Sequence, residues 1–193
     1  MITGLLLAAG GARRFGSQKL LAPLHGVPIV RLAADVLIAT TDDVVVVVGN
    51  DAQRVQHALA GLPLHCAHNL EWATGLASSL RCGIGAVTAR GDAVEAVIVT
   101  LGDQPGLEPD VMRDVMALWR NERPGIVAVR YQGVQDHPVL FDRTVFPELL
   151  LLAGDTGAKP VLQRIPSRVV YLDVTQAAPR DVDTPADLEI LSS

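Results

Sequence analysis

Short apolar runs alternate along the chain with longer stretches in which apolar residues recur at helical spacing. The apolar runs have the length of strands, and glycine, proline or asparagine ends most of them. The predicted strands are residues 2–9, 44–48, 64–67, 93–101, 125–131, 138–141 and 168–174. The predicted helices are residues 27–40, 51–60, 75–89, 109–121, 143–152, 159–164 and 184–191.

The order of these elements predicts the fold. Strands that alternate with helices indicate a mainly parallel sheet whose crossover helices cover both faces. The unbroken β-branched run 44–48 is typical of a strand that is buried on both faces. We find no internal repeat, linker or low-complexity stretch in the sequence. We therefore predict one domain over residues 1–193, with a three-layer α/β/α, Rossmann-like fold.

The loop after the first predicted strand is rich in glycine and carries two cations. In parallel α/β sheets, ligands bind at the carboxyl ends of the strands, and this loop follows the first of them. Glycine lets the backbone approach a ligand closely, successive amides form an anion-binding nest, and arginine and lysine add positive charge. A turn with solvated basic side chains is the alternative, but the combination favours a polyphosphate site. Its residues are Gly10, Gly11, Arg14, Gly16 and Lys19.

The spacing of this loop fits neither common phosphate-binding motif. A P-loop requires Gly-Lys-Ser/Thr after four spacer residues, which Gly16-Ser17 does not supply. A dinucleotide-binding fingerprint requires Gly-x-Gly-x-x-Gly, and the three glycines of the loop are spaced differently. The loop therefore disfavours a flavin- or NAD(P)-dependent enzyme.

Asp103 is the leading candidate for a metal ligand. It follows the β-branched run 97–100 within Gly102-Asp103-Gln104-Pro105, so its carboxylate is expected at the same sheet edge as the glycine-rich loop. Phosphoryl transfer from a triphosphate needs charge neutralisation, which Mg²⁺ held by one or two carboxylates supplies. An aspartate that only stabilises a turn is the alternative. The flanking glycine and proline and the buried strand favour a metal site.

Three further polar segments have no chemical signature of their own. Residues 69–81 read as the capped start of a helix, and a helix N-terminus holds anions and polar groups well. His137, in Gly133-x-x-x-His137-Pro138, can bring an imidazole to the cleft, although a lone histidine is more often a structural group. Residues 154–159 read as a turn that caps a short helix.

Composition and charge exclude several classes of protein. Hydrophobic residues make up 49% of the chain and charged residues 19%, which permits a sizeable core. The net charge of −5 argues against nucleic acid as the main partner. Cys66 and Cys82 lack the spacing of a zinc site, and the apolar run that ends at Gly10 lacks a basic flank and is too short to span a membrane. We therefore expect a cytoplasmic protein that binds neither nucleic acid nor membrane.

The N-terminal segment resembles the signature of a known family. Leu7-Ala8-Ala9-Gly10, with Arg14, Gly16, Lys19 and Gly26-Val27-Pro28, is similar to that of the MobA-like nucleotidyltransferases, which include the molybdenum cofactor guanylyl- and cytidylyltransferases. Such a relationship implies a nucleotide-diphospho-sugar transferase-like fold. It also implies Mg²⁺-dependent transfer of a nucleoside monophosphate from a triphosphate to a phosphorylated acceptor, with release of pyrophosphate. Ala12 and Phe15 depart from the serine and methionine that are usual in the family.

The resemblance assigns roles to residues of the glycine-rich loop and to acidic groups. It implies that Lys19, Arg14 and Asp103 are catalytic and that Asp103 binds the metal. The segment 179–188 resembles the closing motif of the family, in which Asp183, or else Asp181, is the second metal ligand; a cap of the last helix is the structural alternative. The implied nucleotide-binding residues are Leu7, Ala8, Ala9, Gly10, Gly11, Gly16, Lys19, Asn69, Gly75 and Ser79.

The three polar segments resemble those of the cytidylyltransferases rather than those of the guanylyltransferases. Ala9 agrees with this, because guanylyl enzymes tend to carry a second glycine there. The resemblance implies CTP as the nucleotide, a pterin-type phosphate acceptor and a molybdoenzyme that receives the cofactor. The residues that it places toward the acceptor are His137, Pro138, Asp155 and Gly157.

Two other functions remain open at this point. One is the same chemistry on other substrates, namely GTP with a pterin, or CTP or UTP with a sugar or alditol phosphate. The other is a non-catalytic accessory protein that binds molybdenum cofactor for insertion into an enzyme. The presence of Lys19 and Asp103 favours a transferase, because a carrier has no need of a metal-binding carboxylate.

Overall fold

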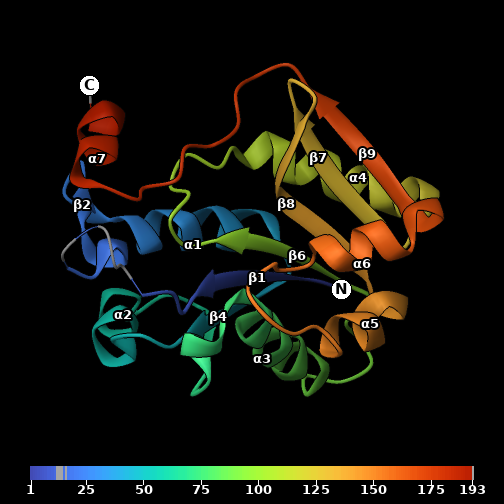
Figure 1. Ribbon diagram of the computed structural model, residues 1–193, viewed down its shortest axis with the longest axis horizontal. Coiled ribbons are helices and arrows are strands. Elements are labelled where there is room, and N and C mark those ends of the chain that lie inside the picture. The colour runs from blue at the N-terminus through green and yellow to red at the C-terminus, as the bar shows by residue number, and fades with distance from the viewer. Residues whose placement is uncertain (12–14, 16, 193) are drawn as a thin grey trace.

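A seven-stranded sheet forms the centre of the molecule (Figure 1). The computed structural model describes residues 1–11, 15 and 17–192. Neighbouring strands are parallel, except where β8 pairs with β6 and β7. The strands in sheet order are β5 (His65–His68), β4 (Asp43–Val48), β1 (Ile2–Ala8), β6 (Ala96–Leu101), β8 (Val134–Asp142), β7 (Ile126–Tyr131) and β9 (Val169–Val174). The mainly parallel sheet confirms the predicted fold class.

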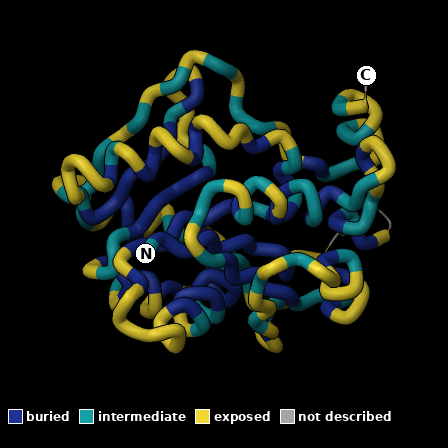
Figure 2. The backbone as a smooth tube through the Cα atoms, turned by 180° about the vertical axis from the view of Figure 1, so that it is seen from behind, coloured by how far each residue is buried: buried dark blue, intermediate teal, exposed yellow. Residues whose placement is uncertain are grey.

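Helices cover both faces of the sheet and give it three layers. Alternate strand residues face opposite sides, so Leu6 packs in the core of one face while Leu5 and Leu7 pack in the core of the other. Figure 2 shows the buried strands, in dark blue, running through the middle of the molecule. The first face is covered by α1 (Ile29–Thr40), α2 (Ala52–Ala58) and α4 (Pro109–Glu122), and the second by α3 (Leu76–Thr88), α5 (Phe146–Leu150) and α6 (Lys159–Arg164).

Smaller elements lie around the end of the sheet where β1 ends. Residues 27–28, predicted as the start of a helix, instead belong to a two-stranded hairpin of β2 (Pro23–Leu24) and β3 (Val27–Pro28). The last helix, α7 (Pro185–Ser192), packs near β2 (Figure 1). Among the described residues, no helix is both long and apolar enough to cross a bilayer.

The β8 strand is longer than predicted. It begins at Val134, whereas the predicted strand begins at Pro138. The prediction misses the first residues because they are polar and break the apolar pattern. Its register against β7 shifts: Val129 pairs with Asp136, but Ala128 pairs with Val139. This irregularity leaves His137 and Pro138 outside the regular pairing, and such bulges commonly redirect a side chain.

The strand order reverses next to β1. From β1 the chain passes through α1 and α2 to β4 and β5 on one side, and α3 then carries it back to β6 on the other side of β1. The loops after β1 and β6 therefore emerge side by side. The Gly102 amide donates to the Leu7 carbonyl at 3.0 Å, and a Cβ on Gly102 would lie 3.2 Å from the Cβ of Ala8. Ligands bind at such a switch point in open α/β sheets.

Trp119 is one of the largest side chains in the core. It lies in α4 with 1% of its surface exposed, its indole Nε1 donates to Asp142 Oδ2 at 3.2 Å, and the Arg123 guanidinium stacks 4.3 Å from the ring centroid. We expect Trp119→Ala to lower the free energy of unfolding by about 3–5 kcal/mol, because it removes a large buried volume. Urea denaturation measures this change.

The matched control for that prediction is Leu70→Ala, because the Leu70 side chain is 83% exposed. We expect its free energy of unfolding to stay within about 0.5 kcal/mol of the parent protein. Equal stabilities of the two variants would contradict the assignment of Trp119 to the core.

Candidate functional site

Lys19 lies between two carboxylates at the carboxyl end of the sheet. It begins a short 3₁₀ turn (Lys19–Leu21), in which Gln18 Oε1 accepts from the Leu20 amide. Its Nζ is 2.6 Å from Asp103 Oδ2 and 2.8 Å from Asp183 Oδ1. The Lys19 side chain is only 12% exposed, against 22% for Asp103 and 35% for Asp183. The structure thus brings together three of the residues that the sequence singled out.

The two carboxylates hold Lys19 in its charged form. Burial lowers the pKa of Lys19, but the attraction and hydrogen bonds of Asp103 and Asp183 outweigh burial, so the pKa is raised above its ordinary value of 10.5. Lys19 is therefore an ammonium group at neutral pH, placed to neutralise negative charge at this edge of the sheet.

Asp183 is positioned by the segment that precedes α7. The Val182 amide donates to the Asp103 carbonyl at 2.9 Å, and the Val182 side chain is fully buried against Leu24 and Ile29. Asp187 Oδ2 accepts from the amides of Asp183 and Thr184 at 3.1 and 2.8 Å. Thr184 and Asp187 thus form a capping box at the start of the helix, and this box also fixes the backbone of Asp183.

Asp181 also faces the site, but its hydrogen-bond partner is Gln104 rather than Lys19. Gln104 is 1% exposed, and its Nε2 donates to Asp181 Oδ1 at 2.8 Å and to Asp136 Oδ1 at 3.2 Å. Burial raises the pKa of Asp181, and the nearby charges of Asp103, Asp136 and Asp183 raise it further against the opposing bond from Gln104. The sequence left open which of Asp181 and Asp183 serves the metal; Asp183 is the one that shares Lys19 with Asp103.

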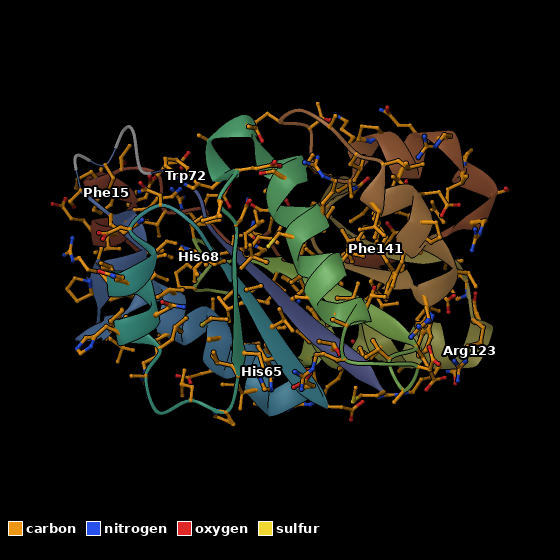
Figure 3. The ribbon with its side chains drawn as sticks, turned by 90° about the horizontal axis from the view of Figure 1, so that it is seen from below. Phe15, His65, His68, Trp72, Arg123 and Phe141 are labelled. Atoms are coloured by element: carbon orange, nitrogen blue, oxygen red, sulfur yellow. The ribbon has the colours of Figure 1, made fainter. Side chains whose placement is uncertain are left out.

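His137 lines a small hollow next to the bulge of β8. The bulge in β8 places His137 there, and Phe141 of the same strand, labelled in Figure 3, also lines the hollow. Most of the lining is apolar, so the hollow suits the edge of an apolar group better than a phosphate. The lining residues are Leu7, Leu76, Leu80, Val99, His137, Val139, Phe141, Gly157 and Ala158. Pro138 adjoins the hollow through its place in the bulge but is not among them.

The turn 154–157 is fastened to the start of α3. Asp155 Oδ1 accepts from the Leu76 amide at 2.9 Å, and the Gly154 carbonyl accepts from the Ala77 amide at 3.2 Å. Gly75 has a φ of 114°, and a Cβ on it would lie 2.6 Å from the Gly154 carbonyl oxygen, so only glycine fits there. Gly75 and Asp155 therefore have structural contacts of their own, and Gly157 lines the hollow.

Asn69 ties the preceding loop to the same helix. It is 4% exposed, its Nδ2 donates to Ser78 Oγ at 2.9 Å and to Ser79 Oγ at 3.0 Å, and its Oδ1 accepts from the Glu71 amide. The side chains of Asn69 and Ser79 are thus engaged with each other beneath the surface rather than directed to the loop after β1.

The described part of the glycine-rich loop is open on one side and packed on the other. Gly10 and Gly11 are exposed, whereas Leu7, Ala8 and Ala9 are buried. Arg14 and Gly16 lie outside the described residues. Trp72 packs against the loop: a Cβ on Gly11 would lie 3.1 Å from its ring, and Figure 3 shows it on the same side as Phe15.

Two features of the site were not singled out from the sequence. Gln104 stands inside the Gly102–Pro105 segment, and Trp72 inside the segment 69–81, but neither was assigned a role. A buried polar residue directly after a candidate metal ligand was the available signal for Gln104, whereas nothing in the sequence places Trp72 on the glycine-rich loop.

Comparison with known proteins places the chain in a family. The profile of the MobA-like NTP transferase domain matches residues 4–169. Nicotine blue oxidoreductase of Paenarthrobacter nicotinovorans is 32% identical, over 95% of this chain and 92% of that protein. The molybdenum cofactor guanylyltransferase of Rhodobacter capsulatus is 32% identical over 60% of this chain and 58% of its own length.

A solved structure supports the same conclusion. The manganese complex of Rv0371C from Mycobacterium tuberculosis is 31% identical and superimposes with a TM-score of 0.81, covering 98% of this chain and 97% of that one. Its fold and the fold described above therefore agree along nearly the whole length of both chains. The chain belongs to the MobA-like NTP transferase family and is a nucleotidyltransferase.

Proposed function

We propose that this nucleotidyltransferase moves CMP from CTP to the phosphate of a molybdopterin-type acceptor and releases pyrophosphate. The observation that carries this proposal is the ammonium group of Lys19 between Asp103 and Asp183, directly beside the loop after β1. A cation, two carboxylates and exposed glycine amides at one switch point are what a metal-bound polyphosphate requires. The kinship to a molybdenum cofactor guanylyltransferase supports a pterin acceptor.

The carboxylate pair fits a magnesium ion. Among residues 1–11, 15 and 17–192, no three histidine, cysteine, aspartate or glutamate side chains form a complete metal cage. Mg²⁺ does not need one, because it keeps several waters and binds through one or two carboxylates together with substrate phosphates. Asp103 and Asp183 would hold it, and when bound it neutralises charge on the phosphates. The manganese complex of Rv0371C supports a divalent ion in such a protein.

The transfer needs no covalent enzyme intermediate. A phosphate oxygen of the acceptor attacks the α-phosphorus of CTP, a new P–O bond forms, and the bond to the β-phosphate breaks, so that its electrons leave with pyrophosphate. In this proposal the amides of Gly10 and Gly11, with Gly16, cradle the triphosphate. Lys19 and Arg14 neutralise the charge on the leaving group, and catalysis comes from position and charge.

The acceptor is assigned to the hollow that His137 lines. Its apolar walls suit one edge of the acceptor rather than its phosphate, and His137, Pro138, Asp155 and Gly157 surround or adjoin it. The nucleotide is assigned to the side of the glycine-rich loop, with Leu7, Ala8 and Ala9 beneath it and Asn69, Gly75 and Ser79 supporting the wall formed by α3. Both ligands then meet beside Lys19 and Asp103.

Two measurements test the proposal. In a thermal-shift panel of ATP, CTP, GTP and UTP with Mg²⁺, we expect the largest rise in Tm with CTP, because a ligand that binds the folded state stabilises it. Pyrophosphate release from CTP should require molybdopterin. Release with a sugar or alditol phosphate instead would assign another acceptor, and binding without release in any mixture would support an accessory protein that only carries the cofactor.

The similarity to nicotine blue oxidoreductase supports one competing activity, the reduction of a small molecule. Its test is the consumption of NADH or NADPH under the conditions of the pyrophosphate assay. Turnover of nicotinamide in the absence of pyrophosphate release would replace the transferase proposal.

Asp187→Ala tests how Asp183 is held. The variant removes the carboxylate that accepts from the Asp183 and Thr184 amides but leaves Asp103, Lys19 and Asp183 in place. We expect the apparent affinity for Mg²⁺ and the turnover to fall about 10-fold, as is typical when a residue that orients a metal ligand is lost. Titration of pyrophosphate release against Mg²⁺ measures both.

The control for this variant is Asp114→Ala, which changes an exposed acidic residue of α4. We expect it to keep the Mg²⁺ dependence of the parent protein. The same weakening in both variants would mean that the loss of any acidic side chain, rather than the loss of the capping box, lowers the affinity.

A further inference from the structure

Gln104 occupies a central and nearly solvent-free position between the two ends of the site. It is 1% exposed, and its Nε2 donates to carboxylates that come from two distant parts of the chain, Asp136 at 3.2 Å and Asp181 at 2.8 Å. Asp136 belongs to β8, which lines the hollow, whereas Asp181 lies two residues before Asp183. A single side-chain amide thus contacts both the strand that lines the hollow and the segment that carries Asp183.

The amide of Gln104 is poorly explained by packing alone. Its Oε1 is buried and has no hydrogen-bond partner among the described residues. Leaving such an atom unpaired is unfavourable, and an apolar side chain of similar size would avoid it. Exchanging the oxygen and nitrogen would direct Oε1 at two carboxylates, which is worse. The residue is therefore best explained by what its N–H groups hold.

Asp136 links Gln104 to His137, because its Oδ1 accepts hydrogen bonds from both residues. Its Oδ1 accepts from the His137 amide at 2.7 Å and lies 3.4 Å from His137 Nδ1. Because an ionised carboxylate only accepts, the ring nitrogen that faces it, Nδ1, carries a hydrogen, and Nε2 is the ring nitrogen left for a ligand. Burial would raise the pKa of Asp136, but the bonds from His137 and Gln104 outweigh it and lower that pKa, so the carboxylate is ionised at neutral pH.

The other side of His137 is fixed as well. The Tyr131 hydroxyl donates to the His137 carbonyl at 3.0 Å, and Tyr131 is only 4% exposed. The backbone and the ring of His137 are therefore both restrained, at the point where the bulge of β8 brings the residue to the hollow.

We propose that Gln104 is a positioning residue for the transfer: through Asp136 it holds the His137 imidazole toward the acceptor hollow, with Nε2 directed to the acceptor. The inference rests on the proposed function. It adds that the residue directly after Asp103 determines the geometry of the acceptor rather than that of the nucleotide.

The first test compares kinetic constants. Gln104→Met keeps the length of the side chain and loses its donors. With CTP, Mg²⁺ and molybdopterin, we expect the KM for molybdopterin to rise and its kcat/KM to fall about 100-fold, because a small misplacement of a positioning group has effects of that size. The KM for CTP should stay within about twofold, since Lys19 and Asp103 are unchanged. Equal increases in both KM values would overturn the proposal.

The second test reads His137 directly and does not depend on activity. In a spectrum of the ¹⁵N-labelled protein that correlates imidazole nitrogens with ring hydrogens, we expect His137 to be the Nδ1–H tautomer. In Gln104→Met it should shift toward a mixture with the Nε2–H form. Asp136→Asn, which leaves the loop after β6 intact, should produce the same shift if Gln104→Met does not fold. His137 nitrogen shifts that are unchanged in the folded variant would overturn the proposal.

Gln132→Met is the matched control, because the Gln132 side chain donates to the exposed Thr175 carbonyl, far along the chain from Gln104. It should change neither the kinetic constants nor the spectrum of His137. The two tests also separate this inference from the proposed function. If the parent protein releases no pyrophosphate with any acceptor, the transferase proposal fails, whereas the tautomer of His137 still decides whether Gln104 positions it.

Discussion

Lys19→Met should lower turnover by about 100-fold or more and, at the same time, tighten the binding of Mn²⁺ to the protein without nucleotide. The loss of turnover follows because a preorganised charge at a developing negative charge contributes 10²–10³-fold in comparable sites, by order of magnitude. The tighter binding follows because Lys19 Nζ lies 2.6 and 2.8 Å from Asp103 and Asp183. Without that ammonium group, a divalent ion no longer competes with a lysine for these two carboxylates.

Pyrophosphate release and a Mn²⁺ titration followed by electron paramagnetic resonance measure the two effects. The control is Arg113→Met, because Arg113 is exposed on α4 and pairs with its neighbour Asp110. Near-normal turnover in Lys19→Met would refute the role of the lysine. Weaker Mn²⁺ binding would instead mean that the ion is held elsewhere.

Asp103→Asn should lower turnover as strongly as Lys19→Met does, but it should change Mn²⁺ binding in the opposite direction. The substitution keeps the shape of the side chain and removes one of the two negative charges that face the Lys19 ammonium group. We expect activity to fall about 100-fold or more, because a neutral amide is a much poorer ligand for Mg²⁺ than a carboxylate. Binding of Mn²⁺ without nucleotide should weaken.

Asp110→Asn is the control for this variant, since Asp110 is an exposed residue with a local partner. The double variant Lys19→Met, Asp103→Asn adds a further test: it should bind Mn²⁺ less tightly than Lys19→Met alone. If Asp103→Asn binds Mn²⁺ as well as the parent protein, Asp103 is not a metal ligand, even if the variant is inactive.

The sequence was sufficient to predict the central strands because they are buried runs. The run 44–48 and the strand before Gly102 contain little but apolar residues, and the loops between them carry the glycines and prolines that end strands. The polar start of β8 was missed for the same reason, since Gln135, Asp136 and His137 lack that pattern. The hairpin of β2 and β3 was missed because Val27-Pro28 also suits a helix start.

The candidate site was predicted only as far as each residue could be placed at the end of a strand. Asp103 and Lys19 follow predicted strands, so the sheet edge that they share could be inferred. Asp181 and Asp183 lie on the same side of an extended segment, so spacing alone could not distinguish them. Contacts between distant residues decide the matter: Lys19 and Asp183 are 164 positions apart, and Gln104 and Asp181 are 77 apart.

The antiparallel strand β8 also constrains the order in which the molecule folds. β7 precedes β8 in the chain, yet β8 lies between β6 and β7, so β7 has no edge of the sheet to join until β8 is present. The two strands are joined by a short turn, which makes their pairing a local and rapid event. The hairpin should therefore form first and attach to β6 as a unit, and the wall that bears His137 is completed in that same step.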